Sequence, residues 1–108
     1  NVLGHPTGRL IGSREAYELD MESILQDAKD KGCFMELNAQ PERLDLNDVH
    51  CMRAKELGVK VVISTDAHST GQLDLMEMGL GQARRGWLRA QDVLNTQSLA
   101  GLKKVLKR

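Results

Sequence analysis

The chain has 108 residues, of which 41% are hydrophobic, and its 15 basic residues balance 15 acidic ones. This length fits one domain, or part of one, with a modest core. With balanced charge, the net charge gives no argument for binding to nucleic acid, membranes or acidic substrates. No apolar run reaches the about 18 residues that a membrane-spanning helix needs.

The cysteines and the first residues bear on the compartment of the protein. Cys33 and Cys51 are the only cysteines, and they lack C-x-x-C spacing. We therefore expect two free thiols in a reducing compartment rather than a disulfide. Because no charged and then apolar leader is present, the expected location is the cytoplasm. The chain begins at Asn1 instead of Met, directly before a predicted strand, which indicates a piece of a longer polypeptide.

Three strand-and-helix units follow one another along the chain. The expected strands and the helices that follow them are 1–4 and 20–31, 33–37 and 46–57, and 59–65 and 73–84. Asp20 is a good helix N-cap, and Gly32 and Gly58 are good helix C-terminal residues. Two short helical segments, near 90–94 and 98–107, close the chain. Strands that alternate with helices predict an α/β fold with right-handed crossovers and a parallel sheet.

The loops differ in length on the two edges of this predicted sheet. The loops that follow the strands are 5–19, 38–45 and 66–72, whereas the returns at Gly32 and Gly58 are short. Long loops at the carboxyl ends of parallel strands are typical of a functional face. We therefore expect the chemistry of this protein at that edge.

Asp66 and His68 leave the third strand together. The apolar run 59–63 is typical of a buried parallel strand, and its end delivers a carboxylate and an imidazole two residues apart. These ligand types suit zinc, manganese or iron. Alternatively, Asp66 caps the turn and His68 is a hydrogen-bonded polar residue. The pair alone does not decide between the two interpretations.

A third candidate ligand, His5, follows the first strand. The proline at position 6 restricts His5 to extended backbone, which projects its ring from the strand end. Behind it, Thr7, Gly8 and Arg9 offer a hydroxyl, an approachable backbone and a guanidinium that matches phosphate. A single histidine in a loop is otherwise most often a surface residue.

The second strand and its loop add polar residues to the same edge. Glu36 and Asn38 share one strand face, so that Glu36 either faces a polar interior or pairs with a cation. Asn38 and Arg43 stay open as substrate contacts.

Other polar residues of this region are interpreted as structural. We read Glu42 and Asp45 in this way, with Asp45 or Asn47 beginning the next helix, and His50 as a packed histidine. The sequence has no dinucleotide-binding glycine motif, no Walker loop and no nucleophile elbow, which argues against redox and P-loop chemistry.

Five motifs together resemble one known family. They resemble the carboxyl-terminal part of the polymerase-and-histidinol-phosphatase (PHP) domain at the end of bacterial and archaeal family X DNA polymerases. The motifs are G-H-P-T-G-R at 4–9, M-E-L-N-A-Q-P-E-R-L-D-L at 35–46, S-T-D-A-H-S at 64–69, Q-A-R-R-G-W-L at 82–88 and V-L-N-T at 93–96. The match covers essentially the whole chain.

The resemblance implies a fold, an activity and a set of ligands. The fold is a distorted (β/α)7 barrel around divalent ions, Mn²⁺ or Zn²⁺, with Mg²⁺ also expected in the parent polymerase. The activity is metal-dependent phosphoester hydrolysis, a 3′-5′ exonuclease that processes DNA 3′ ends in base-excision repair. By the family motifs His5, Asp66 and His68 are metal ligands. From their places in the loops at the same edge, Arg9, Asn38 and Arg43 are candidate substrate contacts. DNA is the expected partner of the full-length protein.

The chain lacks part of the family pattern. The H-x-H motif and further ligands of the family stand upstream, and only three strand-and-helix units are present. We therefore expect residues 1–108 to be the carboxyl-terminal portion of a PHP domain, inactive alone, with exposed sheet edges that pair with a second copy. Two alternatives stay open: a small-molecule phosphatase of the histidinol-phosphatase type, and a non-catalytic module that positions a polymerase.

Overall fold

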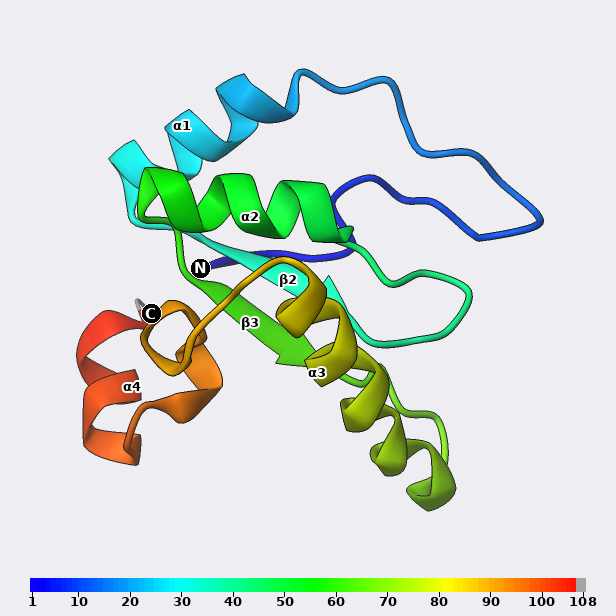
Figure 1. Cartoon of the computed structure of the whole chain (residues 1–108). Coiled ribbons are helices and arrows are strands. Elements are labelled where there is room, and N and C mark those ends of the chain that lie inside the picture. The colour runs from blue at the N-terminus through cyan, green and yellow to red at the C-terminus, as the bar shows by residue number, and fades with distance from the viewer. Residues whose placement is uncertain (107–108) are drawn as a thin grey trace.

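The computed structural model describes residues 1–106 and contains one three-stranded parallel sheet with helices around it (Figure 1). The strands stand in the order β1-β2-β3, so that the predicted α/β fold with consecutive parallel units is confirmed. In chain order the elements are β1 (Val2–Leu3), α1 (Met21–Lys31), β2 (Phe34–Asn38), α2 (Asp48–Leu57), β3 (Val61–Ser64), the 3-10 helix η1 (Thr70–Leu75), α3 (Met76–Arg85), the 3-10 helices η2 (Ala90–Asp92) and η3 (Leu94–Thr96), and α4 (Leu99–Val105).

Local signals account for the ends of the first two helices. The Asp20 side chain accepts a hydrogen bond from the Ser23 N–H, as an N-cap should. Gly32 and Gly58 end α1 and α2 in the left-handed region, at φ 67° and 81°. The second helix begins later than predicted, at Asp48, because Asn47 is its N-cap and accepts from the His50 N–H.

The predicted carboxyl-terminal helices are only partly present. The segment predicted at 90–94 consists of the short 3-10 helices η2 and η3, and α4 occupies part of the segment predicted at 98–107. Residue 107 of that prediction lies outside the described residues. The first turn of the third predicted helix is also 3-10, since η1 precedes α3.

One hydrophobic core lies between the sheet and helices α1 to α3. Alternate strand residues Met35, Leu37, Val61 and Ile63 face this core and are at most 3% exposed. Glu36 and its partner Val62 in β3, on the opposite sheet face, are only partly buried. The helices therefore cover one face of the sheet and leave the face of Glu36 partly open.

The two cysteines are free thiols, as predicted. Cys51 is fully buried in the core, and burial raises the pKa of its thiol to about 12, with the nearby carboxylates of Asp48 and Asp45 adding to this effect. Within residues 1–106, no helix combines the length and apolar character that crossing a membrane requires.

The two edges of the sheet differ. Beside β3, Val93 pairs with Val61, and the Asn95 amide bonds both the N–H and the C=O of Ile63, at 2.8 and 2.9 Å. This segment therefore acts as a short extra strand. At the other edge, Val2 and Leu3 of β1 are 42% and 43% exposed, and β1 pairs with β2 alone within the described residues.

Two glycines of α3 provide a matched test of the packing. A Cβ at Gly79 would lie 2.5 Å from Ile63 Cγ2 and 3.0 Å from Ala39 Cβ, whereas among described residues a Cβ at Gly81 meets nothing within 4 Å. We expect Gly79→Ala to lower the free energy of unfolding by about 1–3 kcal/mol through overpacking. Gly81→Ala should raise it by up to about 1 kcal/mol through helix propensity. Urea unfolding measures both, and equal effects of the two substitutions would contradict this packing.

Candidate metal centre

The carboxyl ends of the three strands point the same way, and the loops that carry the predicted ligands leave from that edge (Figure 1). Glu36 of the central strand ties this edge together. Its carboxylate accepts hydrogen bonds from the backbone N–H of His5 and from the hydroxyl of Ser64, which lie beyond β1 and at the end of β3. Of the two alternatives for Glu36, these hydrogen bonds support a carboxylate that faces polar groups.

Asp66 is held by the residues that follow β2. The Asn38 amide donates to Asp66 Oδ2 at 3.2 Å, and the Gln40 amide donates to the carbonyls of Thr65 and Asp66 at 2.9 and 2.8 Å. Asn38 is only 1% exposed. Burial of Asn38 and its hydrogen bond to Asp66 suit a side chain that positions Asp66. The hydrogen bond from Asn38 uses Asp66 Oδ2 and not Oδ1.

The ring of His68 is oriented by the same segment. Its Nδ1 lies 2.7 Å from the Asp66 carbonyl oxygen, and its backbone N–H donates to the Gln72 amide oxygen at 2.8 Å. With Nδ1 as the donor, the lone pair is on Nε2 of the exposed ring. A backbone carbonyl that fixes the tautomer in this way is the usual support of a metal-binding histidine.

Both His5 and Asp66 have strained backbone. Their φ angles are 25° and 51°, positive values that non-glycine residues rarely adopt. The extended backbone predicted for His5 is therefore wrong, because the turn that follows β1 begins at this residue. Strained conformations concentrate at functional sites because they cost energy and persist only where surrounding contacts impose them. The contacts of Glu36 and Gln40 described above supply that constraint.

Arg9 joins two loops of the edge. Its guanidinium donates to the carbonyl oxygens of Arg43 and Leu44, both at 2.6 Å, and Arg43 returns a 3.4 Å hydrogen bond to the Arg9 carbonyl. Two donors of Arg9 are thereby used within the protein. The contact holds the loop that carries His5 against the loop that follows β2.

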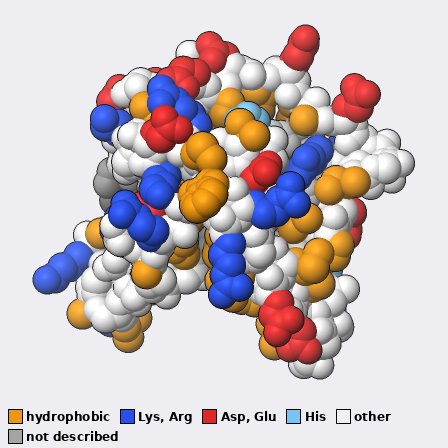
Figure 2. Space-filling view, viewed as in Figure 1, with side chains coloured by type: hydrophobic (Ala, Val, Ile, Leu, Met, Phe, Trp, Pro, Cys, Tyr) orange, Lys and Arg blue, Asp and Glu red, His pale blue; other side chains and the backbone are white. Residues whose placement is uncertain are grey.

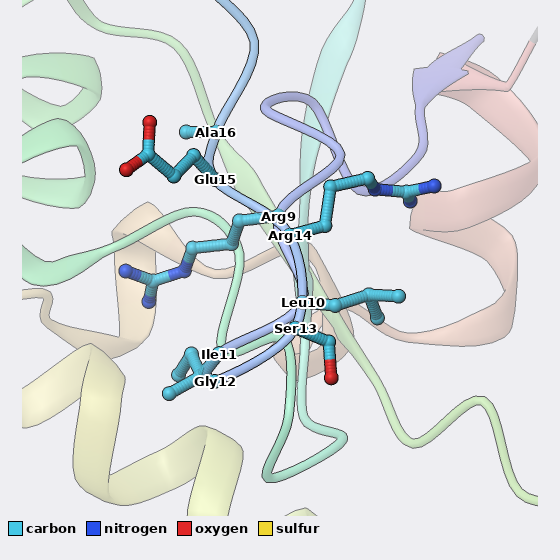
Figure 3. Close-up of a pocket in the computed structure, with 8 residues that line it drawn as sticks. All are labelled: Arg9, Leu10, Ile11, Gly12, Ser13, Arg14, Glu15 and Ala16. Carbon is cyan, nitrogen blue, oxygen red and sulfur yellow. The ribbon is translucent and has the colours of Figure 1, made fainter.

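A pocket on the surface of the described residues does not coincide with the predicted ligands. It has a volume of about 530 Å³ and is lined by the consecutive residues 9–16, a single surface loop (Figure 3). Figure 3 shows the side chains of Arg9 and Arg14 extending to opposite sides of this loop. This hollow is formed by one loop and contains none of the predicted metal ligands, although Arg9, a candidate substrate contact, lines it.

Asp45 has a structural role, as interpreted from the sequence, and of the two residues considered for the start of α2 it is Asn47 that caps the helix. The fully buried carboxylate of Asp45 accepts from the backbone N–H groups of Thr7 and Gly8, at 2.9 and 3.0 Å. Gly8 has φ +65°, and a Cβ there would lie 2.2 Å from the Tyr17 ring. Asp45 therefore fixes the turn behind His5 across 38 residues of sequence, a contact that spacing alone does not reveal.

The same buried region contains His50. Its Nδ1, Asp45 Oδ1 and Thr7 Oγ1 are buried atoms without a protein hydrogen-bond partner among the described residues. Burial lowers the pKa of His50, and the nearby positive charge of Arg9 acts in the same direction, while the carboxylate of Asp45 opposes them. The interpretation of His50 as a packed histidine agrees with this environment.

The predicted ligands do not form a complete site by themselves. Across residues 1–106, no three His, Cys, Asp or Glu side chains are grouped closely enough to hold a metal ion. His5, Asp66 and His68 share one edge and have suitable donor atoms. The structure does not gather them around a common point.

The lowered pKa of His50 leads to a pH-dependent stability. In the unfolded chain the pKa of this histidine returns to about 6.5, so the unfolded state binds more protons between that value and the folded-state pKa. We expect its contribution to the free energy of unfolding to be complete above about pH 6.5 and to decline as the pH falls below it. In urea unfolding across this range, the free energy of unfolding should decline less in His50→Gln than in the unsubstituted chain. A matched His68→Gln variant should show the same decline as the unsubstituted chain. An unchanged pH profile in His50→Gln would contradict the attribution of the decline to His50.

Comparisons with known proteins identify relatives of the whole chain, although no family model matches it. The chain is 46% identical over 108 residues to the DNA polymerase/3′-5′ exonuclease PolX of Bacillus subtilis (strain 168). It is 28% identical over 113 residues to a probable phosphatase of Thermoanaerobacter sp. (strain X514), and 30% identical over 74 residues to one of Caldanaerobacter subterraneus subsp. tengcongensis.

The chain spans only part of each relative. All of it aligns with PolX, of which it covers 19%, and 99% of it aligns with the Thermoanaerobacter phosphatase, of which it covers 43%. The same 108 residues are thus similar to a segment of a polymerase and to a segment of a phosphatase. These similarities confirm the resemblance to the PHP region of a bacterial family X DNA polymerase.

Proposed function

We propose that residues 1–108 are the carboxyl-terminal portion of a PHP-type domain of a family X DNA polymerase. In this role the chain contributes to a metal-dependent phosphoesterase that acts as a 3′-5′ exonuclease on DNA ends during base-excision repair in the cytoplasm. The observation that carries the proposal is the 46% identity to PolX over the whole chain. Helices that cover only one face of the sheet suit the wall of a distorted (β/α)7 barrel.

The proposed ligands are His5, Asp66 and His68. Two imidazoles and a carboxylate are donors that Mn²⁺ and Zn²⁺ accept, and Mg²⁺ suits the polymerase centre of a parent protein. When bound, divalent ions would activate water and neutralise charge on the phosphate. Because the described residues do not close a site, the remaining ligands come from outside this chain.

The chain's own residues orient these ligands. Asn38 and Gln40 hold Asp66, the Asp66 carbonyl fixes the His68 ring, and Glu36 holds the backbone of His5. Arg9 fastens the loop of His5, and Arg43 remains a proposed contact for a substrate phosphate. Such outer partners commonly change metal affinity or activity by about 10- to 100-fold.

Two other functions fit the same residues less well. Similarity to a probable phosphatase, at 28% identity, supports a small-molecule phosphoesterase, but the identity to PolX is higher. A non-catalytic module that positions a polymerase would not need an oriented histidine. The Nδ1 contact of His68 and the amide contact of Asp66 therefore favour the catalytic proposal.

A chimaera tests this function. The chain would replace the aligned segment of PolX from B. subtilis, with which it shares 46% identity. We expect this chimaera to degrade single-stranded DNA from the 3′ end with Mn²⁺. His5→Ala, Asp66→Asn and His68→Ala should each lower the rate by more than about 100-fold, and Asn38→Ala by about 10- to 100-fold.

The third histidine of the chain supplies the matched control. His50→Gln should leave the exonuclease rate within about twofold of the unsubstituted chimaera, since His50 faces Asp45 rather than the strand ends. Polymerase activity in each variant verifies that the preparations are intact. Full exonuclease activity after loss of His68 and Asp66 would overturn the ligand assignment. Robust Mn²⁺-dependent degradation by the 108-residue chain alone would overturn the proposal that ligands are missing from it.

We also propose that the isolated chain self-associates through the open edge of β1. Exposed strand edges present unpaired N–H and C=O groups to another chain. Light scattering should show a mass that rises with concentration. Val2→Lys, which places a charge on this edge, should shift the molecules toward monomer, whereas Val49→Lys on the exposed surface of α2 should not. A constant monomeric mass over a wide concentration range would contradict the proposal.

A further inference from the structure

Helix α3 ends in a Schellman motif in which a tryptophan takes the place usually held by glycine. The Leu88 N–H donates to the Ala83 carbonyl and the Trp87 N–H to the Arg84 carbonyl, both at 3.0 Å. Trp87, at φ 61°, is therefore the left-handed residue of the motif. A bulky side chain is unfavourable at such a position.

The neighbouring glycine does not relieve this strain. Gly86 stands one residue earlier, at φ −85°, and a Cβ there would lie 2.7 Å from Cys51 Cβ and 2.9 Å from the Asp48 carbonyl oxygen. Close packing of α3 on α2 thus explains Gly86. It leaves the choice of tryptophan at position 87 unexplained.

Burial does not explain Trp87 either. Its side chain is 70% exposed, the highest value among the large exposed hydrophobic residues of the described chain. Both backbone polar groups of Trp87 are nevertheless hydrogen-bonded. Its N–H donates to the Arg84 carbonyl, and its carbonyl oxygen accepts from Lys55 Nζ at 2.7 Å. An indole with a rigid base and a free face is therefore presented to solvent.

Basic residues surround this indole. Arg84 and Arg85 precede it on the last turn of α3, Arg89 follows it, and Lys55 contacts its carbonyl. Arg85 and Arg89 are 73% and 62% exposed, and their ion pairs with Asp48 and Asp92 are long, at 3.5 and 3.7 Å. In Figure 2, Lys and Arg side chains lie on several sides of a hydrophobic protrusion near the middle of the face where α3 ends in Figure 1.

These residues are not the proposed metal ligands. Lys55 lies in the last turn of α2 and Trp87 follows the C-cap of α3, while Arg85 pairs with Asp48 at the start of α2. Within residues 1–106, no hydrogen bond or ion pair joins any of them to His5, Asp66 or His68. A ligand of these residues therefore contacts side chains other than those of the proposed hydrolytic centre.

We propose that Trp87 and the surrounding cations, which we call the Trp87 patch (Lys55, Arg84, Arg85, Trp87 and Arg89), bind single-stranded nucleic acid. A base stacks on the free indole face while the guanidinium and ammonium groups neutralise the adjacent phosphates. Aromatic platforms within a positive surface are the usual means of binding single strands without sequence preference. Four basic groups against the two acidic groups of Asp48 and Asp92 make a polyanion the complementary partner.

The only tryptophan of the chain is its own reporter. Titration of the 108-residue chain with oligothymidylate should quench the Trp87 fluorescence in a saturable manner, and the affinity should fall with added salt. In anisotropy measurements with fluorescein-labelled oligothymidylate, Trp87→Gly should weaken binding by about 5- to 150-fold, the range expected for one stacked base. Trp87→Phe should retain part of the affinity, and Arg84→Gln with Arg85→Gln should weaken both the binding and its salt dependence.

A stability measurement on Trp87→Gly and two control variants separate base stacking from a loss of structure. Trp87→Gly should preserve or raise the thermal midpoint, because glycine relieves the left-handed strain. Leu99→Ala removes a hydrophobic side chain that is 68% exposed on α4 and should leave binding unchanged. His50→Gln should also leave it unchanged, because His50 belongs neither to the Trp87 patch nor to the proposed metal ligands. Both readouts measure binding and not hydrolysis, so failure of the hydrolytic proposal would not affect this one. Unaltered binding by Trp87→Gly, or binding without fluorescence quenching, would overturn it, as would a patch that binds an acidic peptide but no oligothymidylate.

Discussion

The carboxylate of Glu36 is the contact on which the carboxyl edge depends. It lies on the central strand and accepts from the chain that leaves β1 and from the hydroxyl at the end of β3. Glu36 therefore holds the start of the loop after β1 and the end of β3 beside its own strand, so that polar residues of the three loops lie at the same edge of the sheet. A carboxylate is suited to this role because it offers two acceptor oxygens, and each of them accepts one of these hydrogen bonds. Asp45 has a similar role, since its carboxylate accepts from the backbone N–H groups of the Thr7–Gly8 turn.

The distribution of burial across the sheet separates stability from function. Met35, Leu37, Val61 and Ile63 form the core with the helices, so their face contributes the hydrophobic stabilisation. The opposite face carries Glu36 and remains accessible. Further ligands of the proposed centre have to approach from that polar face. This division agrees with the proposal that other ligands complete the centre, since residues 1–106 contain no group of three His, Cys, Asp or Glu side chains that could hold a metal ion.

Sequence patterns predicted what local contacts determine. The parallel units, the Asp20 cap and the glycines at 32 and 58 follow from spacing within a few residues, and all are observed. The roles of Glu36 and Asp45 depend on partners 31 and 38 residues away, which periodicity cannot identify. Likewise, the helix predicted at 90–94 became short 3-10 turns because Val93 and Asn95 bind the edge of β3.

Backbone strain is found at both proposed binding sites. Among residues 1–106, the non-glycine residues with positive φ are His5, Leu44, Asp66 and Trp87. Two of them are proposed metal ligands and a third is the proposed stacking platform. The backbone of each of these three residues is held by a hydrogen bond to a side chain of another segment. The fold therefore imposes the strained conformation. A chain shaped only by stability would place glycine at these positions, as it does at Gly8, Gly12, Gly32 and Gly58. At His5, Asp66 and Trp87 the strain supports the binding roles proposed for these side chains, whereas no such role is proposed for Leu44.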